Sequence, residues 1–254
     1  MKWGICVLLT IACGTVCAQS LAPTGTLRAV FLQNNPVQGR VDARTGAVSG
    51  PAADLTRELG RGLGRPVSVS GVAGVRDLID ALKSHNADIG FLAFDESRAV
   101  EVDFSRVYSL SWSGYIVRAD SPIRKLDDVD RAGVRVGSAR GDSPEIYLSR
   151  ALKNAELKRY ENPPAAQVVQ ILASREVDVW AANRQRLIEM AAGTPKLRVL
   201  PGNYTAVRQS IAVAKGNAAA LEAINRFLEK ARDSGSIKAS IERAGLAASV
   251  DVAP

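Results

Sequence analysis

In the first hundred residues, short apolar runs typical of buried strands alternate with segments whose apolar residues recur at helical spacing. Short apolar runs at 26–32, 66–70 and 87–94 predict strands. Between them, leucines at every fourth position of 51–63 and a second apolar face in 74–83 predict helices. This strand–helix–strand–helix–strand order predicts a parallel sheet with right-handed crossovers.

A second alternation of the same kind begins near the middle of the chain. Strands are expected at 134–137, 157–160 and 177–182, and helices at 144–148 and 163–173. The chain therefore contains two α/β units in sequence, which suits its 254 residues and its 46% hydrophobic content.

Two segments connect these units. Residues 109–117 place serines and a glycine around one tryptophan, which suits a segment that crosses from one unit to the other. Residues 204–209 are expected to cross back, and 210–214 to return to the first sheet. The apolar spacing after Asn217 and in 237–244 predicts two final helices that belong to the first unit.

The N-terminus has the pattern of a secretory signal peptide over residues 1–18. Lys2 is followed by an uncharged apolar run, and Val16-Cys17-Ala18 forms a small-x-small cleavage site. We therefore expect cleavage after Ala18 and a periplasmic protein. The alternative is a lipid anchor at Cys13, but the residues before this cysteine make a poor lipobox.

Cysteine, histidine and charge exclude several classes of function. Cys6, Cys13 and Cys17 all lie in the signal peptide, and His85 is the only histidine, so we expect no disulfide, no metal site and no cofactor. The net charge of +7 falls to +6 without Lys2, and the charges are scattered. Nucleic-acid binding is therefore not expected.

Arg98 is the leading candidate for binding an anion. It follows the apolar strand 87–94, and Asp95 can cap a short helical turn that begins at Glu96. The carboxyl end of a strand is where open α/β sheets bind ligands, and a guanidinium offers a planar fork of donors to a carboxylate or phosphate. The alternative is a surface ion pair with Glu96 or a nearby acid such as Glu101 or Asp103.

Two further turns carry polar groups at the ends of predicted strands. Gly141-Asp142-Ser143 opens a helix after the strand 134–137, and free backbone N–H groups at such a helix end attract anions. Simple helix capping by Asp142 or Ser143 is the alternative. Asn183 follows the strand 177–182 and is either a ligand contact or an N-cap.

Three stretches of the sequence resemble one family of bacterial proteins. They read ADIGFLAFDESRAVEVDFS, RTGAVSGPAADLTRELGRGLG and VAKGNAAALEAINRFLEKARDSGSIKASIERAG. The first is similar to the signature of periplasmic solute-binding proteins of family 3, the polar amino-acid type, in which a buried strand leads to an arginine and then to V-D-F-S. The resemblance covers roughly residues 24 to 246.

The resemblance implies a two-lobed α/β structure, the periplasmic-binding-protein type II fold, with two mainly parallel sheets and helices on both faces. Lobe 1 would contain residues 24–108 and 210–254, and lobe 2 residues 113–205. The hinge crossovers would lie at about 108–113 and 205–210. Such Venus-flytrap proteins are monomers that close on a small molecule and deliver it to an inner-membrane ABC permease.

The resemblance also assigns roles to residues, and the sequence departs from some of them. The family arginine that matches Arg98 grips the ligand's α-carboxylate, and the loop that matches 141–143 closes on it from lobe 2. The aspartate that holds the α-ammonium is replaced by Asn183. Phe91, Ala93 and Asp95 replace a glycine and two hydroxylic residues, and Asn34 is also expected at the site. Apolar walls are expected from three aromatic residues: Phe91, Trp112 and Trp180.

The exchange at Asn183 bears directly on the ligand. Burial of an ammonium among neutral groups costs several kcal/mol, so an α-amino acid should bind poorly unless Asp95 or Asp142 substitutes. We expect a small polar, carboxylate-bearing ligand without an α-ammonium. Two other functions use the same fold. They are a secreted enzyme similar to cyclohexadienyl dehydratase, whose acidic residue would lie near Arg186, and a ligand-sensing module.

Overall fold

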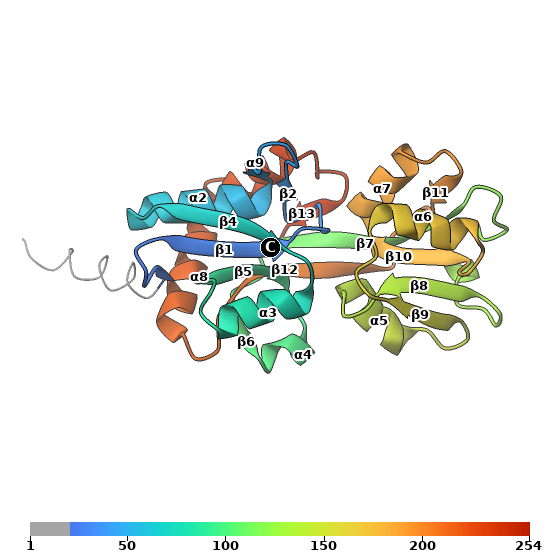
Figure 1. Cartoon of the computed structure of the whole chain (residues 1–254), viewed down its shortest axis with the longest axis horizontal. Helices are drawn as coiled ribbons and strands as arrows, with labels where there is room; N and C mark the ends of the chain where they lie inside the picture. The colour runs from blue at the N-terminus through green and yellow to red at the C-terminus, as the bar shows by residue number, and fades with distance from the viewer. Residues whose placement is uncertain (1–20) are drawn as a thin grey trace, which may run out of the picture.

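The computed structural model describes residues 21–254, which form two lobes joined by two long strands (Figure 1). The joining strands are β7 (Ser109–Arg118) and β12 (Thr205–Ala214). The predicted signal peptide lies outside the described residues. Within residues 21–254, no helix has the length and apolar character needed to span a membrane.

Each lobe combines a sheet with helices. In lobe 1, on the left of Figure 1, the elements are β1 (Leu27–Leu32), β2 (Arg40–Val41), β3 (Val48–Ser49), α2 (Pro51–Leu63), β4 (Val67–Val72), α3 (Val75–Lys83), β5 (Ile89–Ala93), α4 (Glu96–Ala99), β6 (Val102–Phe104), α8 (Ala218–Asp233), α9 (Ser236–Arg243) and β13 (Val250–Val252). In lobe 2 they are the 3-10 turn η1 (Leu126–Asp128), β8 (Arg135–Ala139), α5 (Ser143–Ala151), β9 (Glu156–Tyr160), α6 (Ala165–Ala173), β10 (Val179–Asn183), α7 (Arg184–Ala192) and β11 (Leu197–Val199).

The two sheets have the same plan. β4, β1 and β5 are parallel neighbours in lobe 1, and β9, β8 and β10 are parallel neighbours in lobe 2. A joining strand then pairs antiparallel with the last of the three, β12 with β5 and β7 with β10. The predicted α/β fold with parallel strands in two lobes is confirmed.

The sheets are not separate, in contrast to the expected arrangement. β7 and β12 pair antiparallel with each other from Ser113↔Thr205 to Ser109↔Gln209, which joins the two lobes in one 11-stranded sheet whose main path is β4-β1-β5-β12-β7-β10-β8-β9. The reason is that both crossing segments are extended and lie side by side. β13 adds a third strand there, because it pairs with β7 at 109–111. The paired stretch lies at the predicted crossovers, whose role as a hinge stays a prediction.

Helices cover both faces of each sheet and enclose a core on each side. In lobe 1, α2, α8 and α9 pack on one face, while α3 packs on the other. In lobe 2, α6 and α7 cover one face and α5 the other. The bounds of helix α2 follow from its own sequence, because Pro51 occupies its first turn and Gly64 ends it with a φ of 63°.

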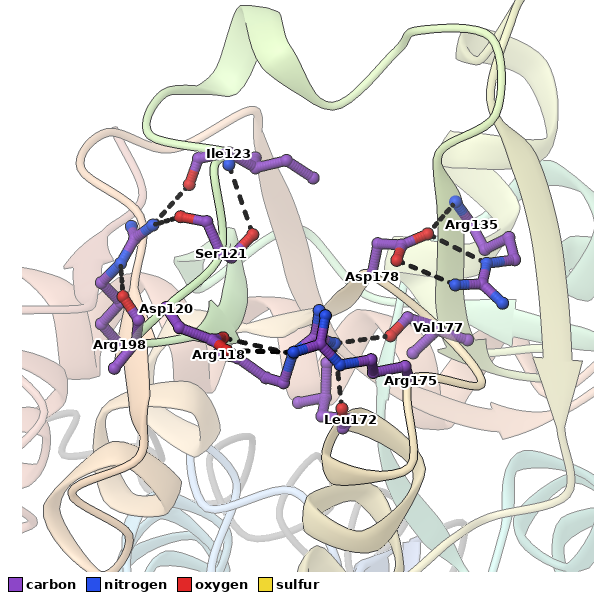
Figure 2. Close-up of polar contacts among 11 residues, drawn as sticks. Arg118, Asp120, Ser121, Ile123, Arg135, Leu172, Arg175, Val177, Asp178 and Arg198 are labelled. Carbon is purple, nitrogen blue, oxygen red and sulfur yellow. Dashed lines mark hydrogen bonds and ion pairs between the residues drawn. The ribbon is translucent and has the colours of Figure 1, made fainter.

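An arginine–aspartate pair with the same hydrogen-bond pattern occurs in each lobe. In lobe 1, Arg28 on β1 donates from its backbone N (2.8 Å) and Nε (3.1 Å) to Oδ2 of Asp88, and from Nη2 (2.6 Å) to Oδ1. In lobe 2, Arg135 on β8 makes the same three bonds to Asp178 at 3.0, 3.0 and 2.9 Å (Figure 2). Each aspartate directly precedes β5 or β10. We call each pair a strand brace, because it fixes that strand against its parallel neighbour.

Candidate functional site

A small cavity lies between the lobes, where strands β1, β5, β8 and β10 end. Its volume is about 50 Å³. Residues of both lobes and of both joining strands line it: Leu32, Asn34, Asn35, Gln38, Ala73, Gly74, Ala93, Arg98, Ser111, Asp142, Ser143, Pro144, Asn162, Ala182, Asn183, Arg186, Val207 and Gln209. The position agrees with the general rule that open α/β sheets bind ligands beyond the carboxyl ends of their strands.

Arg98 connects the two lobes at this cavity. Its side chain donates from Nη1 to the carbonyl oxygen of Ala93 (2.8 Å) and, across the cleft, from Nη2 to that of Gly141 (2.6 Å). The Ser143 hydroxyl lies 3.4 Å from Nη1. The residue is only 5% exposed, and its Nε has no hydrogen-bond partner within residues 21–254. Burial lowers the pKa of this guanidinium, although Asp142 and Asp95 oppose the shift.

The alternative of a surface ion pair for Arg98 does not hold. Glu101 binds Arg76 and Lys83 instead. Asp103 binds Lys215 at 2.9 Å. Arg98 is therefore a buried cation that faces a cavity with one donor unused, and such a donor is costly to leave without a partner.

Asp142 faces the cavity from lobe 2. It precedes α5, but its side chain makes no capping bond, so simple capping does not account for it. Burial raises the pKa of the Asp142 carboxyl above its usual range, and Arg98 and Arg186 oppose the shift only in part. Asp142 is the single acidic side chain among the cavity-lining residues of the described chain.

The side-chain amide of Asn183 makes two hydrogen bonds, one within its helix and one across the cleft. Its Oδ1 accepts a hydrogen bond from the backbone N of Arg186 (3.0 Å), which is an N-cap of α7. Its Nδ2 donates across the cleft to Oδ1 of Asn35 (2.8 Å). The N-cap alternative is therefore seen, together with a contact between the lobes.

Six of the predicted site residues line the cavity: Asn34, Ala93, Arg98, Asp142, Ser143 and Asn183. Gly141 takes part through its carbonyl group only. Asp95 lies outside the lining set, since its Oδ1 caps α4 by accepting from Ser97 N (2.9 Å). Whether any of these residues binds a ligand stays a prediction.

The predicted aromatic walls are wrong. Phe91 is fully buried in the core of lobe 1, where its ring meets Tyr108 edge-on at 6.1 Å. Trp180 is fully buried in the core of lobe 2. The indole of Trp112 turns to the C-terminal strand and donates to Asp251 (2.8 Å). None of the three rings lines the cavity, because two pack in the cores of the lobes and the third is held at the C-terminal strand.

Sequence reasoning missed several polar residues at the cavity. Gln38 and Gln209 are almost fully buried, and their amides form a chain in which Gln38 Nε2 donates to Gln209 Oε1 (3.2 Å) and Gln209 Nε2 to Ser111 Oγ (2.8 Å). These residues are far apart in the sequence, so no local pattern marks them.

Arg186 was also missed as a cavity residue. It is partly buried, and within residues 21–254 the sole hydrogen bond of its side chain runs from Nη2 to the carbonyl oxygen of Pro163 (2.6 Å). Burial lowers the pKa of its guanidinium, and Asp142 opposes the shift. A signal for it did exist, because Arg186 follows Asn183 by three residues as Arg98 follows Asp95.

With the two lobes and the cleft in place, the family can be stated. The model of the bacterial extracellular solute-binding proteins, family 3, matches residues 27–245, and the chain belongs to this family.

Individual relatives agree with this class. A glutamine-binding protein of Geobacillus stearothermophilus is 28% identical over 130 residues, which are 51% of this chain and 48% of that protein. The chain thus matches about half the length of this relative. An ancestral arginine-binding protein with bound glutamine is similar in structure, with a TM-score of 0.74, 25% identity and coverage of 87% and 98% of the two chains.

A third similar structure bears on the enzyme alternative. It is an ancestral amino acid-binding protein described as a precursor of cyclohexadienyl dehydratase, with a TM-score of 0.73, 22% identity and coverage of 89% and 98% of the two chains. At this identity the likeness concerns the fold alone.

Proposed function

We propose that this protein binds a small carboxylate-bearing solute in the cavity between its lobes and delivers it to an inner-membrane ABC permease. The observation that carries the proposal is Arg98, a buried cation at the cavity with an unused Nε donor. A carboxylate can accept from this donor and balance the charge. The relatives, which are named as amino-acid-binding proteins, support a solute-binding role.

The ligand in this proposal has no α-ammonium group. The amide of Asn183 is neutral and already bonded to Arg186 N and to Asn35. An ammonium at that position would lie near the cation of Arg186, and the single cavity acid, Asp142, already balances Arg98 and Arg186, so its burial would be unfavourable. This distinguishes the protein from relatives that are named for amino acids.

The remaining parts of the proposal concern how the protein operates. It is secreted to the periplasm after removal of residues 1–18, acts as a monomer, and closes by bending of β7 and β12. Bonds that cross the cleft, such as Arg98 to Gly141 and Asn183 to Asn35, would then form on closure.

The test is a binding experiment on the mature chain. Simple carboxylates should raise the melting temperature and give measurable heats, whereas the twenty amino acids should give little stabilisation. Arg98→Ala should weaken binding by at least about thirtyfold, and Arg98→Lys should not restore it fully, because a buried charge-assisted pair is lost. Arg76→Ala is the matched control, since Arg76 binds Asp80 and Glu101 on the surface of the same lobe.

Three results would contradict the proposal. They are equal affinity in Arg98→Ala and the wild type, a folded wild type that no carboxylate stabilises, and a large shift with an ordinary amino acid. Circular dichroism of Arg98→Ala, with its own melting curve, separates loss of binding from loss of folding.

We further propose that the protein binds its ligand without chemical change. Asp142 interacts electrostatically with two arginines, and the position near which the dehydratase-like enzymes have a glutamate is taken by Arg186. A proton NMR spectrum of the bound carboxylate, recorded before and after long incubation, should be unchanged. Conversion that Asp142→Asn abolishes would assign the protein to the enzymes.

A further inference from the structure

The two cavity arginines occupy equivalent positions in the two lobes. In lobe 1 the braced strand β5 leads to the N-cap residue Asp95, and Arg98 is the third residue of the helix that follows. In lobe 2 the braced strand β10 ends at the N-cap residue Asn183, and Arg186 is the third residue of α7. The same local structure therefore directs one guanidinium into the cavity from each side.

Arg186 has unused hydrogen-bonding capacity at the cavity. A guanidinium offers five N–H donors, and within residues 21–254 Arg186 uses Nη2 alone, for the carbonyl of Pro163. No acidic residue of the described chain makes an ion pair with it. Asp142 lies near enough to act on both arginines electrostatically, but it is a single carboxyl group opposite two cations.

The rest of the lining mixes polar groups with mostly small apolar side chains, of which Leu32, Pro144 and Val207 are the largest. Amides predominate, with Asn34, Gln38, Asn162 and Gln209 among them, and no aromatic ring of the described chain is part of the lining. A long aliphatic or aromatic group would find few contacts there. The cavity instead suits a short ligand that has charged groups at its ends and hydrogen-bonding atoms between them.

We propose that Arg186 is a second anion-binding residue and that the ligand is a short dicarboxylate, with one carboxylate on Arg98 and the other on Arg186. This inference rests on the proposed function, because it specifies the ligand of the same cavity. In the place where an amino-acid-binding relative would need a negative charge for an ammonium, this chain has a neutral Asn183 and the cation of Arg186. The ligand class is thereby shifted from a zwitterion to a dianion.

The test compares dicarboxylates with monocarboxylates of the same chain length, such as succinate and butyrate, on the full mature chain by calorimetry. The wild type should bind the dicarboxylate at least about tenfold more tightly. Arg186→Gln should remove most of this preference and leave monocarboxylate affinity within about threefold. Arg98→Ala should weaken both ligands.

Arg184→Gln is the matched control for Arg186→Gln. Arg184 lies on the same helix and carries the same charge, but its Nη1 donates to the carbonyl of Gly202 (2.8 Å) and it does not line the cavity. It should leave the affinity for both ligands unchanged. If both substitutions lower dicarboxylate affinity equally, the effect is one of general charge and the inference is wrong.

Other outcomes separate the inference from the proposed function. Binding of monocarboxylates and dicarboxylates with equal affinity, or a preference that survives Arg186→Gln, overturns the inference and leaves the proposed function intact. Tighter binding of inorganic phosphate or sulfate that depends on both arginines would also overturn the dicarboxylate class. A folded wild type that binds no carboxylate overturns both.

Discussion

Lobe 1 and lobe 2 each present an arginine to the cavity from the third position of a helix, yet the two arginines differ in their contacts. Arg98 is 5% exposed and donates across the cleft to Gly141. Arg186 is partly exposed and donates to Pro163 of its own lobe. In the proposed binding mode, Arg98 would therefore couple ligand binding to the contact between the lobes, whereas Arg186 would act on the ligand alone.

The capping residues that precede these arginines differ as well. Asp95 accepts from the backbone N and the hydroxyl of Ser97 and remains outside the cavity lining. Asn183 caps α7 and lines the cavity, where it also reaches Asn35. The same local position thus serves helix capping in both lobes and adds a contact between them, since Asp95 lies 3.9 Å from Arg150 of lobe 2, but only Asn183 lines the cavity.

The strand braces give the largest expected effect. Asp88→Ala should lower the free energy of unfolding by about 2 kcal/mol and Asp178→Ala by about 1 kcal/mol, because removal of the carboxylate leaves the backbone N–H and the guanidinium of a partly exposed arginine without their acceptor. The difference follows from burial, since the side chain of Asp88 is 5% exposed and that of Asp178 is 23% exposed. Urea unfolding followed by circular dichroism measures both.

A surface pair provides the control for the braces. Asp127 lies 3.4 Å from Lys125 in lobe 2, and both side chains are more than half exposed. Asp127→Ala should change stability by less than about 0.5 kcal/mol. Equal losses in the two brace variants would show that depth of burial does not set their strength.

The sequence was sufficient for most of the scaffold, because each lobe repeats a strong local pattern. The run at 26–32 became β1, and the segment after Asn183 became helix α7. The short strands β6 and β13 were missed, since each has three residues and gains its place from pairing with β12 or β7. Pairing between distant segments leaves no signal in either one.

The candidate site was less predictable than the scaffold. Arg98 could be identified because a strand, a cap and a family motif coincide at that position. Phe91 and Trp180 were misplaced, because an apolar strand residue can face either a core or a cavity and the sequence does not distinguish the two. Gln38 and Gln209 come together only when β12 returns to lobe 1.

Substitution of Asp142, the acid that faces both arginines, tests the charge of the ligand, and its expected effect is smaller than that of the strand braces. If the ligand is a dianion, an ionised Asp142 repels it, so Asp142→Asn should raise dicarboxylate affinity by about tenfold at neutral pH. If the ligand instead carries an ammonium, Asp142 is its partner and the same substitution should lower affinity. Calorimetry with dicarboxylates and with acidic amino acids distinguishes these cases.

The ionisation of Asp142 should make the stability of the folded protein fall as the pH rises. Because burial raises the pKa of Asp142 in the folded protein, ionisation opposes folding once the pH exceeds the ordinary carboxyl value of about 4. Arg98 and Arg186 attract the ionised form and Glu145 repels it, and the net direction is upward. Asp142→Asn should therefore be more stable than the wild type at neutral pH, and the difference should vanish near pH 4. A variant that is less stable at pH 7 would contradict this direction.

The smallest expected effect concerns a second feature that the lobes share, the end of the helix before each braced strand. α3 ends with N–H groups of His85 and Asn86 bonded to Leu82 and Ala81, and α6 ends with the same two bonds from Arg175 and Glu176. This Schellman pattern requires a left-handed residue, and the φ values are 56° at His85 and 60° at Arg175. Helices α2 and α9 place Gly64 and Gly245 at the equivalent position.

His85→Gly should therefore stabilise the protein by about 0.5–1 kcal/mol, because glycine adopts this conformation without the strain that a Cβ atom causes. Arg175→Gly should gain less, since it also loses the exposed contact with Asp120. Gly64→Ala is the reverse control and should destabilise by about 1 kcal/mol through backbone strain alone, as no atom lies within 4 Å of the added Cβ. Urea unfolding of the three variants measures the order. A destabilised His85→Gly would mean that the histidine side chain makes a contribution larger than the strain at its φ.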